Sequence, residues 1–290
     1  MPRMFTRKPD APNPAEARLA ALEHALGEME GRQKALERRH DALKAFIVPA
    51  VWNALDRLYE RTEPLSEPVC LACAFTAPAA KFAVRTDACV FGGGKLERLE
   101  CPNCGCLFGP LKYLQTPPEL VDLDYRLLYT DYSEGDSTEA EIRAFRAMGP
   151  KPGGVYLNWG SGAWSESVER LRAEGFDVWG FEPHATVDSQ FVVQRRDQIS
   201  AKFDGVFSNN LIEHLFDPAE QFADWKSLLK PGGRMAHASP CYEWSFAYTR
   251  FHVFFPLGEA PARLAERTGF RLTGAEDEGE FHVRVFEAAD

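Results

Sequence analysis

The stretch 155-VYLNWGSGAWS-165 has the form of a buried strand, a glycine turn and the start of a helix. Glycines in the turn Gly160-Ser161-Gly162 let the backbone bend tightly and approach a ligand. Two positions depart from the usual pattern of such turns. Asn158 stands where an acidic residue is often found, and Trp164 occupies the place of a frequent third glycine. The stretch therefore predicts a ligand-binding loop in a strand–turn–helix unit.

Strand and helix patterns alternate from this loop to the end of the chain. Expected strands are 154–159, 177–182, 190–194, 203–208, 232–238, 270–275 and 281–287. Expected helices are 164–174, 184–189, 210–229 with a break near Asp217, and 258–268. This alternation predicts an α/β fold with a Rossmann-like, mainly parallel seven-stranded sheet and helices on both faces.

Composition restricts the partners and the compartment. The chain has 290 residues, 45% hydrophobic and 26% charged, with a net charge of −10, so nucleic acid is not an expected partner. We find no apolar run of about 18 residues and no signal peptide, which favours a cytoplasmic protein without a membrane span. Six of the seven cysteines lie within 70–106, which indicates reduced thiols around a metal.

Five segments follow from the composition shifts along the chain. They are a disordered start (1–14), a helix (15–62), a zinc-binding module (63–110), a tyrosine-rich connector (111–150) and a ligand-binding domain (151–290). A linker is expected near 62–68, and Pro49 is expected to kink or break the helix. Asp136, Ser137 and Thr138 offer caps for a helix near 138–148.

The N-terminal helix carries an apolar seam at alternating spacings of three and four residues. Its members are Leu19, Leu22, Leu26, Met29, Leu36, Leu43 and Ile47, with Gln33 and His40 on the same seam. Two interpretations remain open: a short coiled coil that makes the chain a homo-oligomer, or a single amphipathic helix lying on its own domain.

The cysteine module has the pattern Cys70-x2-Cys73, 27 residues, then Cys101-x2-Cys104. Each pair can bind one side of a tetrahedral zinc ion, and a site closed by four sulfurs is structural. Gly105 follows the second pair, where such a turn often needs positive φ. Cys106 could replace Cys104 as a ligand, and the alternative to a zinc site is a set of reduced core cysteines.

The second strand of the α/β region ends in Glu182, 20 residues after Gly162. An acidic side chain at this strand tip can accept hydrogen bonds from both ribose hydroxyls. A nicotinamide dinucleotide and S-adenosylmethionine both fit these two features. Trp164 at the helix start would crowd a pyrophosphate, which favours S-adenosylmethionine over a dehydrogenase cofactor.

The segment 203-FDGVFSNNLIEHLFDPAEQFADWKSLLKPGG-233 adds a buried strand, a turn with Glu213 and His214, and a helix capped by Asp217. With the glycine turn and Glu182, it resembles class I S-adenosylmethionine-dependent methyltransferases from Val155 to about Pro240. The cysteine pairs and 107-LFGPLKYLQTPPELVDLDYRLLYTDYSEGD-136 resemble the zinc-bearing part of sugar methyltransferases and of relatives found with surface-polysaccharide enzymes.

The resemblance implies methyl transfer from S-adenosylmethionine to a small-molecule acceptor, with a sugar or nucleotide sugar expected. It places the cofactor against Asn158, Gly160, Ser161, Gly162, Glu182 and Asn209, with Asp197 or the equally placed Gln198 at the adenine. A methyltransferase fold that acts as an oligomeric scaffold is the alternative, supported by Asn158 and Trp164.

Candidate catalytic residues follow the fourth and fifth expected strands, since ligands bind at the carboxyl ends of parallel strands. Glu213 and His214 follow the fourth, and a histidine can serve there as general base. The loop 239-SPCYEWSFAYTRFHVFFPL-257 adds Tyr242, Tyr248 and His252, either as a pocket roof or as a packed aromatic insertion. Tyr125, Tyr129 and Tyr132 of the connector are expected to form a lid over the cofactor.

Overall fold

A computed structural model describes residues 13–61, 67–129, 132, 135–162, 166–185 and 189–289 of the chain. Trp164 and most of the predicted linker lie outside these residues. The chain divides into two compact units, Met1–Val51 and Trp52–Asp290. The boundaries expected near residues 110 and 150 both fall inside the second unit. In the described part of the chain, no helix is both long and apolar enough to cross a membrane.

Helix α1 (Pro14–Arg61) begins where the sequence provides a cap. The side chain of Asn13 accepts a hydrogen bond from the backbone nitrogen of Ala15 (3.1 Å), and Pro14 occupies the first helical position. The expected break at Pro49 is wrong, because α1 continues through it. A proline removes only one backbone donor, and the other backbone hydrogen bonds of this 48-residue helix keep it continuous.

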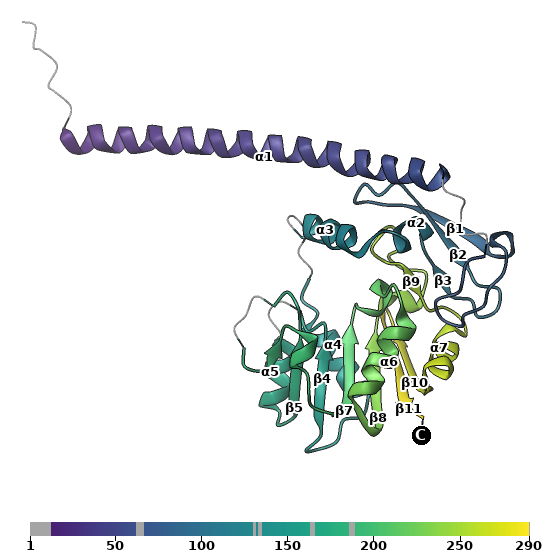
Figure 1. Ribbon diagram of the computed structural model, residues 1–290. Coiled ribbons are helices and arrows are strands. Elements are labelled where there is room, and N and C mark those ends of the chain that lie inside the picture. The colour runs from purple at the N-terminus through teal and green to yellow at the C-terminus, as the bar shows by residue number, and fades with distance from the viewer. Residues whose placement is uncertain are drawn as a thin grey trace, which may run out of the picture. The chain divides into compact units, whose positions relative to one another are not determined.

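The second unit contains a seven-stranded sheet in the order β10-β11-β8-β7-β4-β5-β6 (Figure 1). Its strands are β4 (Val155–Trp159), β5 (Asp177–Phe181), β6 (Val192–Val193), β7 (Phe203–Asn209), β8 (Leu229–Ala238), β10 (Phe270–Glu278) and β11 (Phe281–Ala288). The predicted seven strands are confirmed, but the sheet is mixed. Strand β11 runs antiparallel to both neighbours, because it returns from β10 through a tight turn in which Gly279 has a φ of +60°.

Helices cover both faces of this sheet. They are α4 (Thr138–Ala147), α5 (Glu166–Ala173), α6 (Pro218–Leu228) and α7 (Ala260–Thr268). Phe145 of α4 and Leu171 of α5 share one buried cluster with Ala236 and Ala238 of β8. His237 points to the opposite face, where it stacks on Trp225 of α6 at 4.2 Å. The helix expected at 184–189 is not present at residues 184, 185 and 189, since 184 lies in a turn and the other two have no regular structure. Residues 186–188 lie outside the described residues.

A second, antiparallel sheet holds the cysteine module in the order β1-β2-β3-β9. Its strands are β1 (Ala83–Ala88), β2 (Lys95–Glu100), β3 (Leu107–Phe108) and β9 (Phe254–Phe255). Short helices complete the unit: η1 (Ala79–Lys81), α2 (Leu111–Leu114), α3 (Pro118–Leu128), η2 (Arg196–Gln198), η3 (Ile212–His214) and η4 (Pro240–Tyr242). Strand β9 belongs to the segment after β8, so this sheet combines residues from both halves of the chain.

Candidate active site and cysteine cluster

The glycine turn lies against the carboxyl end of the neighbouring strand. Both glycines have left-handed backbones, with φ of +77° at Gly160 and +74° at Gly162, which other residues rarely adopt. The backbone nitrogens of Gly160 and Ser161 bond the carbonyl of Phe181 at 2.8 and 3.2 Å. The turn is therefore bound to Phe181, the residue before Glu182. This brings the ends of β4 and β5 close together, as a ligand that contacts both would require.

The other predicted cofactor residues are distributed unevenly. The Glu182 carboxylate accepts a hydrogen bond from the backbone nitrogen of His184 at 2.9 Å, which holds it at the strand tip. Asn209 ends β7, which pairs with β4 in parallel. Asp197 lies on η2, beyond the edge strand β6, and its exposed side chain forms an ion pair with Arg195. The Gln198 side chain instead caps its own turn, because it accepts bonds from the backbone nitrogens of Gln194 and Arg195.

Asn158 is fully buried near the end of β4. It lies beside the carboxylate of Glu141, which was not predicted from the sequence. Its amide donates to Glu141 of α4 at 2.6 Å and lies 3.0 Å from the hydroxyl of Ser167, which also donates to Glu141. Burial raises the pKa of Glu141, while hydrogen bonds from Ser137, Ser167 and Asn158 act in the opposite direction. The carboxyl group that often stands at position 158 is thus supplied by Glu141 of the neighbouring helix.

Glu141 could have been recognised from its spacing. It stands on the same helical face as Thr138, Ile142 and Phe145, all of which are buried. A glutamate on an apolar face needs partners, since burying an unpaired carboxylate is costly. The amide oxygen of Asn158 has no hydrogen-bond partner among the described residues, so this cluster retains one buried acceptor.

Three of the predicted catalytic residues come together at the end of β7. One ligand-type atom from each of Glu213, His214 and His252 lies within 4.8 Å of the others. The two imidazole rings are 4.9 Å apart between centroids and nearly perpendicular. A backbone bond from Val253 to the carbonyl of Glu213 (2.8 Å) attaches the loop after β8 to η3.

Backbone carbonyls fix the tautomer of both histidines. Nδ1 of His214 lies 3.0 Å from the carbonyl of Phe251, and Nδ1 of His252 lies 3.0 Å from that of Phe246. A carbonyl only accepts, so in each neutral ring Nδ1 carries the proton and Nε2 holds the basic lone pair. Burial, together with the nearby His214, lowers the pKa of His252 to about 2, so this ring is neutral at physiological pH.

Two predicted tyrosines have different environments. Tyr125 of α3 lies with its hydroxyl 2.9 Å from Nδ1 of His214 and packs on Phe251 at 4.6 Å. The connector thus reaches the histidine pair, while Tyr129 and Tyr132 are more exposed. Tyr242 is buried under Arg284, and its hydroxyl has no hydrogen-bond partner among the described residues. Burial raises the pKa of Tyr242 well above its usual value, so the hydroxyl remains protonated.

Arg98 of β2 holds the loop that carries His252. Its guanidinium is fully buried and donates to the carbonyls of Ala247 (2.8 Å), Thr249 (2.6 Å) and His252 (2.9 Å). Burial lowers the pKa of Arg98 to about 10, which leaves it charged at neutral pH. The sequence contained a signal for this role, because strand alternation places Arg98 on the same face as the buried Leu96.

The predicted zinc ligands form a compact cluster. The sulfurs of Cys70, Cys73, Cys101 and Cys104 all lie within 4.8 Å of one another. Cys70 and Cys104 are 3.6 Å apart, and Cys73 and Cys101 are 3.7 Å apart. Sulfurs at 2.3 Å from a tetrahedral zinc would be separated by about 3.8 Å, so the spacing fits this ion. Cys106 is not in this group, and its sulfur donates to the carbonyl of Leu107.

Both cysteine pairs adopt the same turn. The backbone nitrogens of Cys70 and Cys101 each donate to the carbonyl five residues ahead, at 2.9 and 2.8 Å. Gly105 has a φ of +78°, as expected, and Ala74 adopts +57° at the equivalent position. The repeated turn directs two sulfurs from each pair toward one point, which is the geometry that a structural zinc requires.

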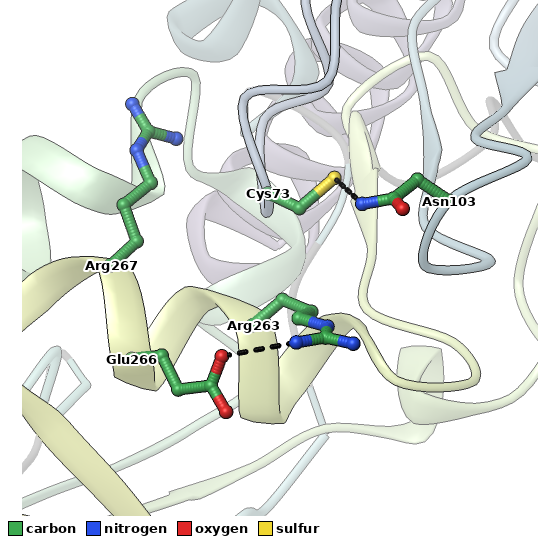
Figure 2. Close-up of a pocket in the computed structure, with 5 residues that line it drawn as sticks. All are labelled: Cys73, Asn103, Arg263, Glu266 and Arg267. Carbon is green, nitrogen blue, oxygen red and sulfur yellow. Dashed lines mark hydrogen bonds and ion pairs between the residues drawn. The ribbon is translucent and has the colours of Figure 1, made fainter.

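Helix α7 and the residues before it bind these turns. The backbone nitrogen of Glu259 donates to the carbonyl of Cys104 at 2.9 Å, and Arg267 donates to that of Leu71 at 3.1 Å. Figure 2 shows an open depression between α7 and the cluster, where Asn103 donates to the sulfur of Cys73. This depression lies at the cysteine cluster, and the glycine turn does not line it.

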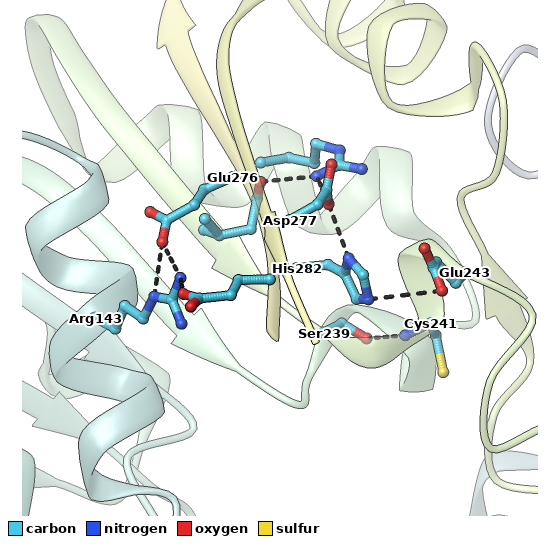
Figure 3. Close-up of polar contacts among 10 residues, drawn as sticks. Arg143, Ser239, Cys241, Glu243, Glu276, Asp277 and His282 are labelled. Carbon is cyan, nitrogen blue, oxygen red and sulfur yellow. Dashed lines mark hydrogen bonds and ion pairs between the residues drawn. The ribbon is translucent and has the colours of Figure 1, made fainter. Parts of the chain in front are cut away.

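His282 of β11 faces the neighbouring strand β10. In Figure 3 it lies between Asp277 and Glu243, with Nδ1 2.8 Å from the Asp277 carboxylate. Asp277 is its direct partner in the β10–β11 register and also binds Arg284 at 2.7 Å. This network joins β10 to β11, which agrees with a structural role for His282.

Residues 142–280, just under half of the chain, are similar to the family described as "Methyltransferase domain". No curated protein matches the chain in sequence.

The solved structures to which the chain is similar include CalO1, a methyltransferase of calicheamicin biosynthesis in its SAH-bound form. It is 14% identical, with 62% of this chain and 61% of that chain covered and a TM-score of 0.44. The chain thus spans about three-fifths of the length of CalO1. The Burkholderia thailandensis 1,6-didemethyltoxoflavin-N1-methyltransferase is 16% identical, with 68% and 96% covered and a TM-score of 0.42. An S-adenosylmethionine-dependent methyltransferase from Mesorhizobium loti is 18% identical, with 51% and 97% covered and a TM-score of 0.39.

Proposed function

We propose that this protein transfers a methyl group from S-adenosylmethionine to a hydroxyl-bearing small molecule, with a sugar or nucleotide sugar as the acceptor. One observation carries the proposal. The carboxyl ends of β4, β5 and β7 present the glycine turn, Glu182 and the Glu213–His214–His252 cluster at one edge of a sheet with a methyltransferase fold. Ligands of open α/β sheets bind at this edge.

The cofactor residues that we propose are those fixed at the strand ends. Gly160 and Gly162 allow close approach, and Glu182 would accept hydrogen bonds from the ribose hydroxyls. The buried oxygen of Asn158 and the nearby Glu141 carboxylate suit the ammonium group of the methionyl part. Asp197 is proposed only as an adenine partner, since its observed partner is Arg195.

S-adenosylmethionine supplies an activated methyl group when it is bound, so the protein must position and deprotonate the acceptor. We assign deprotonation of the acceptor to Nε2 of His214, since Nδ1 of this ring faces the carbonyl of Phe251. Tyr125 and the carbonyl of Phe251 fix the orientation of that ring. His252 remains neutral and would accept a hydrogen bond from a second acceptor hydroxyl, while Tyr242 and Glu213 line the same side.

The cysteine cluster is proposed to hold one structural zinc, because all four positions of the ion would be filled by sulfur. Its contribution to the reaction would be indirect. The zinc turns support β2 and β3, and β2 carries Arg98, which holds the His252 loop. Loss of zinc should therefore disturb the histidine pair as well as the module.

The scaffold alternative depended on Asn158 and Trp164. Asn158 now has an explanation that requires no loss of function, because Glu141 supplies the missing carboxylate 2.6 Å away. Trp164 lies outside the described residues and gives no support to either side. The exposed helix seam favours an assembly, but an assembled enzyme satisfies it equally well.

Calorimetric titration with S-adenosylmethionine and its demethylated product tests the cofactor first. Glu182→Ala should weaken binding by about 1.5–3 kcal/mol, the range for hydrogen bonds to a charged group. Glu169→Ala, an exposed glutamate of α5, is the matched control and should bind normally. Wild-type protein that binds neither compound would contradict the proposal. A radiolabelled methyl-transfer screen over nucleotide sugars and small phenols then identifies the acceptor.

A further inference from the structure

The N-terminal helix presents an apolar seam that belongs to no described core. Leu22, Met29, Leu36 and Leu43 are 58 to 65% exposed, as are Leu19 and Leu26 at 58%. Within α1, which is described in full, Trp52 is the buried residue, and it lies beyond the seam. A lone helix of this length gains little stability without a packed face. The seam therefore requires an occupant.

The spacing of the seam identifies the kind of occupant. From Leu19 to Ile47 the seam positions recur at alternating intervals of three and four, which is a period of 3.5 residues. A straight helix packing on a globular surface follows 3.6, whereas a sustained 3.5 repeat is typical of helices that wind around each other. In heptad terms, Leu19 and Leu26 are a positions, and Leu22, Met29, Leu36 and Leu43 are d positions.

Charges beside the seam determine the direction of the partner. The charged g positions are Arg18, Arg32 and Arg39, with Ala25 and Phe46 at the other two. The e positions hold Glu23, Glu30, Glu37 and Lys44. In a parallel pair each g residue faces the e residue five positions later in the partner, which pairs Arg18 with Glu23 and Arg32 with Glu37. In an antiparallel pair g faces g and e faces e, so arginines would mostly meet arginines and glutamates would meet glutamates. The one unfavourable parallel contact, Arg39 with Lys44, is outnumbered.

The polar seam residues point to the same arrangement. Gln33 and His40 both occupy a positions. In a parallel, in-register pair an a residue packs against its own copy, so Gln33 meets Gln33 and each amide finds a polar partner. In an antiparallel pair a residues pack against d residues, which here are leucine and methionine. Gln33 would then keep only its bond to Glu37 of the same helix (2.9 Å), and its amide oxygen would face apolar side chains. A polar a position of this kind specifies register and oligomeric state.

We infer that residues 18–47 form a parallel, in-register, two-stranded coiled coil with a second copy of this chain. The inference is independent of the methyl-transfer proposal, because it uses no residue of the candidate site. Since the copies are parallel, both Trp52–Asp290 units are attached at the same end of the coiled coil.

The test uses the full-length chain, because the last part of α1 belongs to the second unit. Trp52, the first residue of that unit, packs on Tyr113 and must be kept. Light scattering should give the mass of two chains. Arg32→Glu should shift the dimer toward monomer on dilution, and the double variant Arg32→Glu/Glu37→Arg should restore it. Arg38→Glu makes the same charge change at an outward f position and is the matched control. An Arg32→Glu variant that dimerises like wild type would contradict the parallel arrangement.

Cross-linking measures the direction independently. Leu22→Cys should form a disulfide between two copies of residue 22 under mild oxidation, identified by mass spectrometry of the linked peptide. Ala21→Cys, which faces outward at a c position, should not. Leu36→Glu places a charge in the seam without touching the second unit, and it should give monomers with unchanged thermal unfolding of that unit. A wild-type mass of one or three chains, or a residue-22 disulfide that fails to form in a dimer, overturns the inference.

Discussion

Replacing Asn158 by aspartate would place a second carboxylate against Glu141. Nδ2 of Asn158 lies 2.6 Å from the Glu141 carboxylate, and both residues are buried. Two carboxylates at this distance cannot both ionise, so one must keep a proton in the folded state. Holding an aspartic acid with a reference pKa of 3.9 protonated costs about 4 kcal/mol at pH 7 and about 3 kcal/mol at pH 6.

The sign of the pH dependence follows from proton counting. Above pH 4 the unfolded variant releases this proton, whereas the folded variant retains it. Stability must therefore fall with rising pH, by about 1.4 kcal/mol per pH unit relative to wild type. Urea unfolding at pH 5, 6, 7 and 8 measures this slope, and a variant as stable as wild type at pH 8 would refute the reasoning.

The double variant Glu141→Gln/Asn158→Asp is the matched control. It moves the single negative charge back to position 158 and leaves an amide to donate to it. Both the stability and the pH dependence of the wild type should return. If the buried charge contributes to cofactor binding, calorimetry should also show affinity for S-adenosylmethionine close to wild type, whereas Glu141→Gln alone should bind more weakly.

Four further outcomes are expected. Purified protein should contain about one zinc per chain, and Cys73→Ser should lose most of it; folded, metal-free wild-type protein would contradict the site. His214→Gln should slow methyl transfer about 10²–10⁴-fold with cofactor affinity unchanged, and a wild-type rate would make His214 structural. Arg98→Met should destabilise the second unit by about 3–5 kcal/mol in urea unfolding, because buried carbonyls lose their donor, and an effect below 1 kcal/mol would argue against the role. Burial lowers the pKa of His237 to about 3, so folding excludes a proton that the unfolded chain binds below pH 6.5. His237→Phe should therefore reduce by about 2 kcal/mol the stability that wild type loses between pH 7 and pH 5, and an unchanged loss would contradict this.

The order of elements could be predicted from the sequence because local signals mark each one. Gly160 and Gly162 in the glycine turn, and Gly105 after the second cysteine pair, all have positive φ, as predicted. The predicted break at Asp217 separates η3 from α6, and Asp217 is the N-cap of α6. The antiparallel direction of β11 was not specified, since strand periodicity carries no information on direction. The break predicted at Pro49 was wrong because the local preference of one proline is smaller than the sum of the other hydrogen bonds of a long helix.

The missed residues share a physical cause. Glu141 and Arg98 act through contacts with residues distant in sequence, so their partners cannot be found from local patterns. Glu141 and Arg98 nevertheless stand at positions whose periodicity predicts burial. A charged residue on a buried face is therefore a useful signal, even when its partner is unknown.

The pairing of β3 with β9 has a consequence for the order in which the protein can fold during synthesis. Leu107 pairs with Phe255, and the carbonyls that bind Arg98 belong to residues 247 to 252. A ribosome adding about 5–20 residues per second needs about 7–30 s to go from Leu107 to Phe255. Throughout that interval strand β3 of the nascent cysteine module lacks its partner β9, and Arg98 lacks the carbonyls that it binds in the folded protein. Early zinc binding would hold the two cysteine turns together while the last strand of their sheet is still being made.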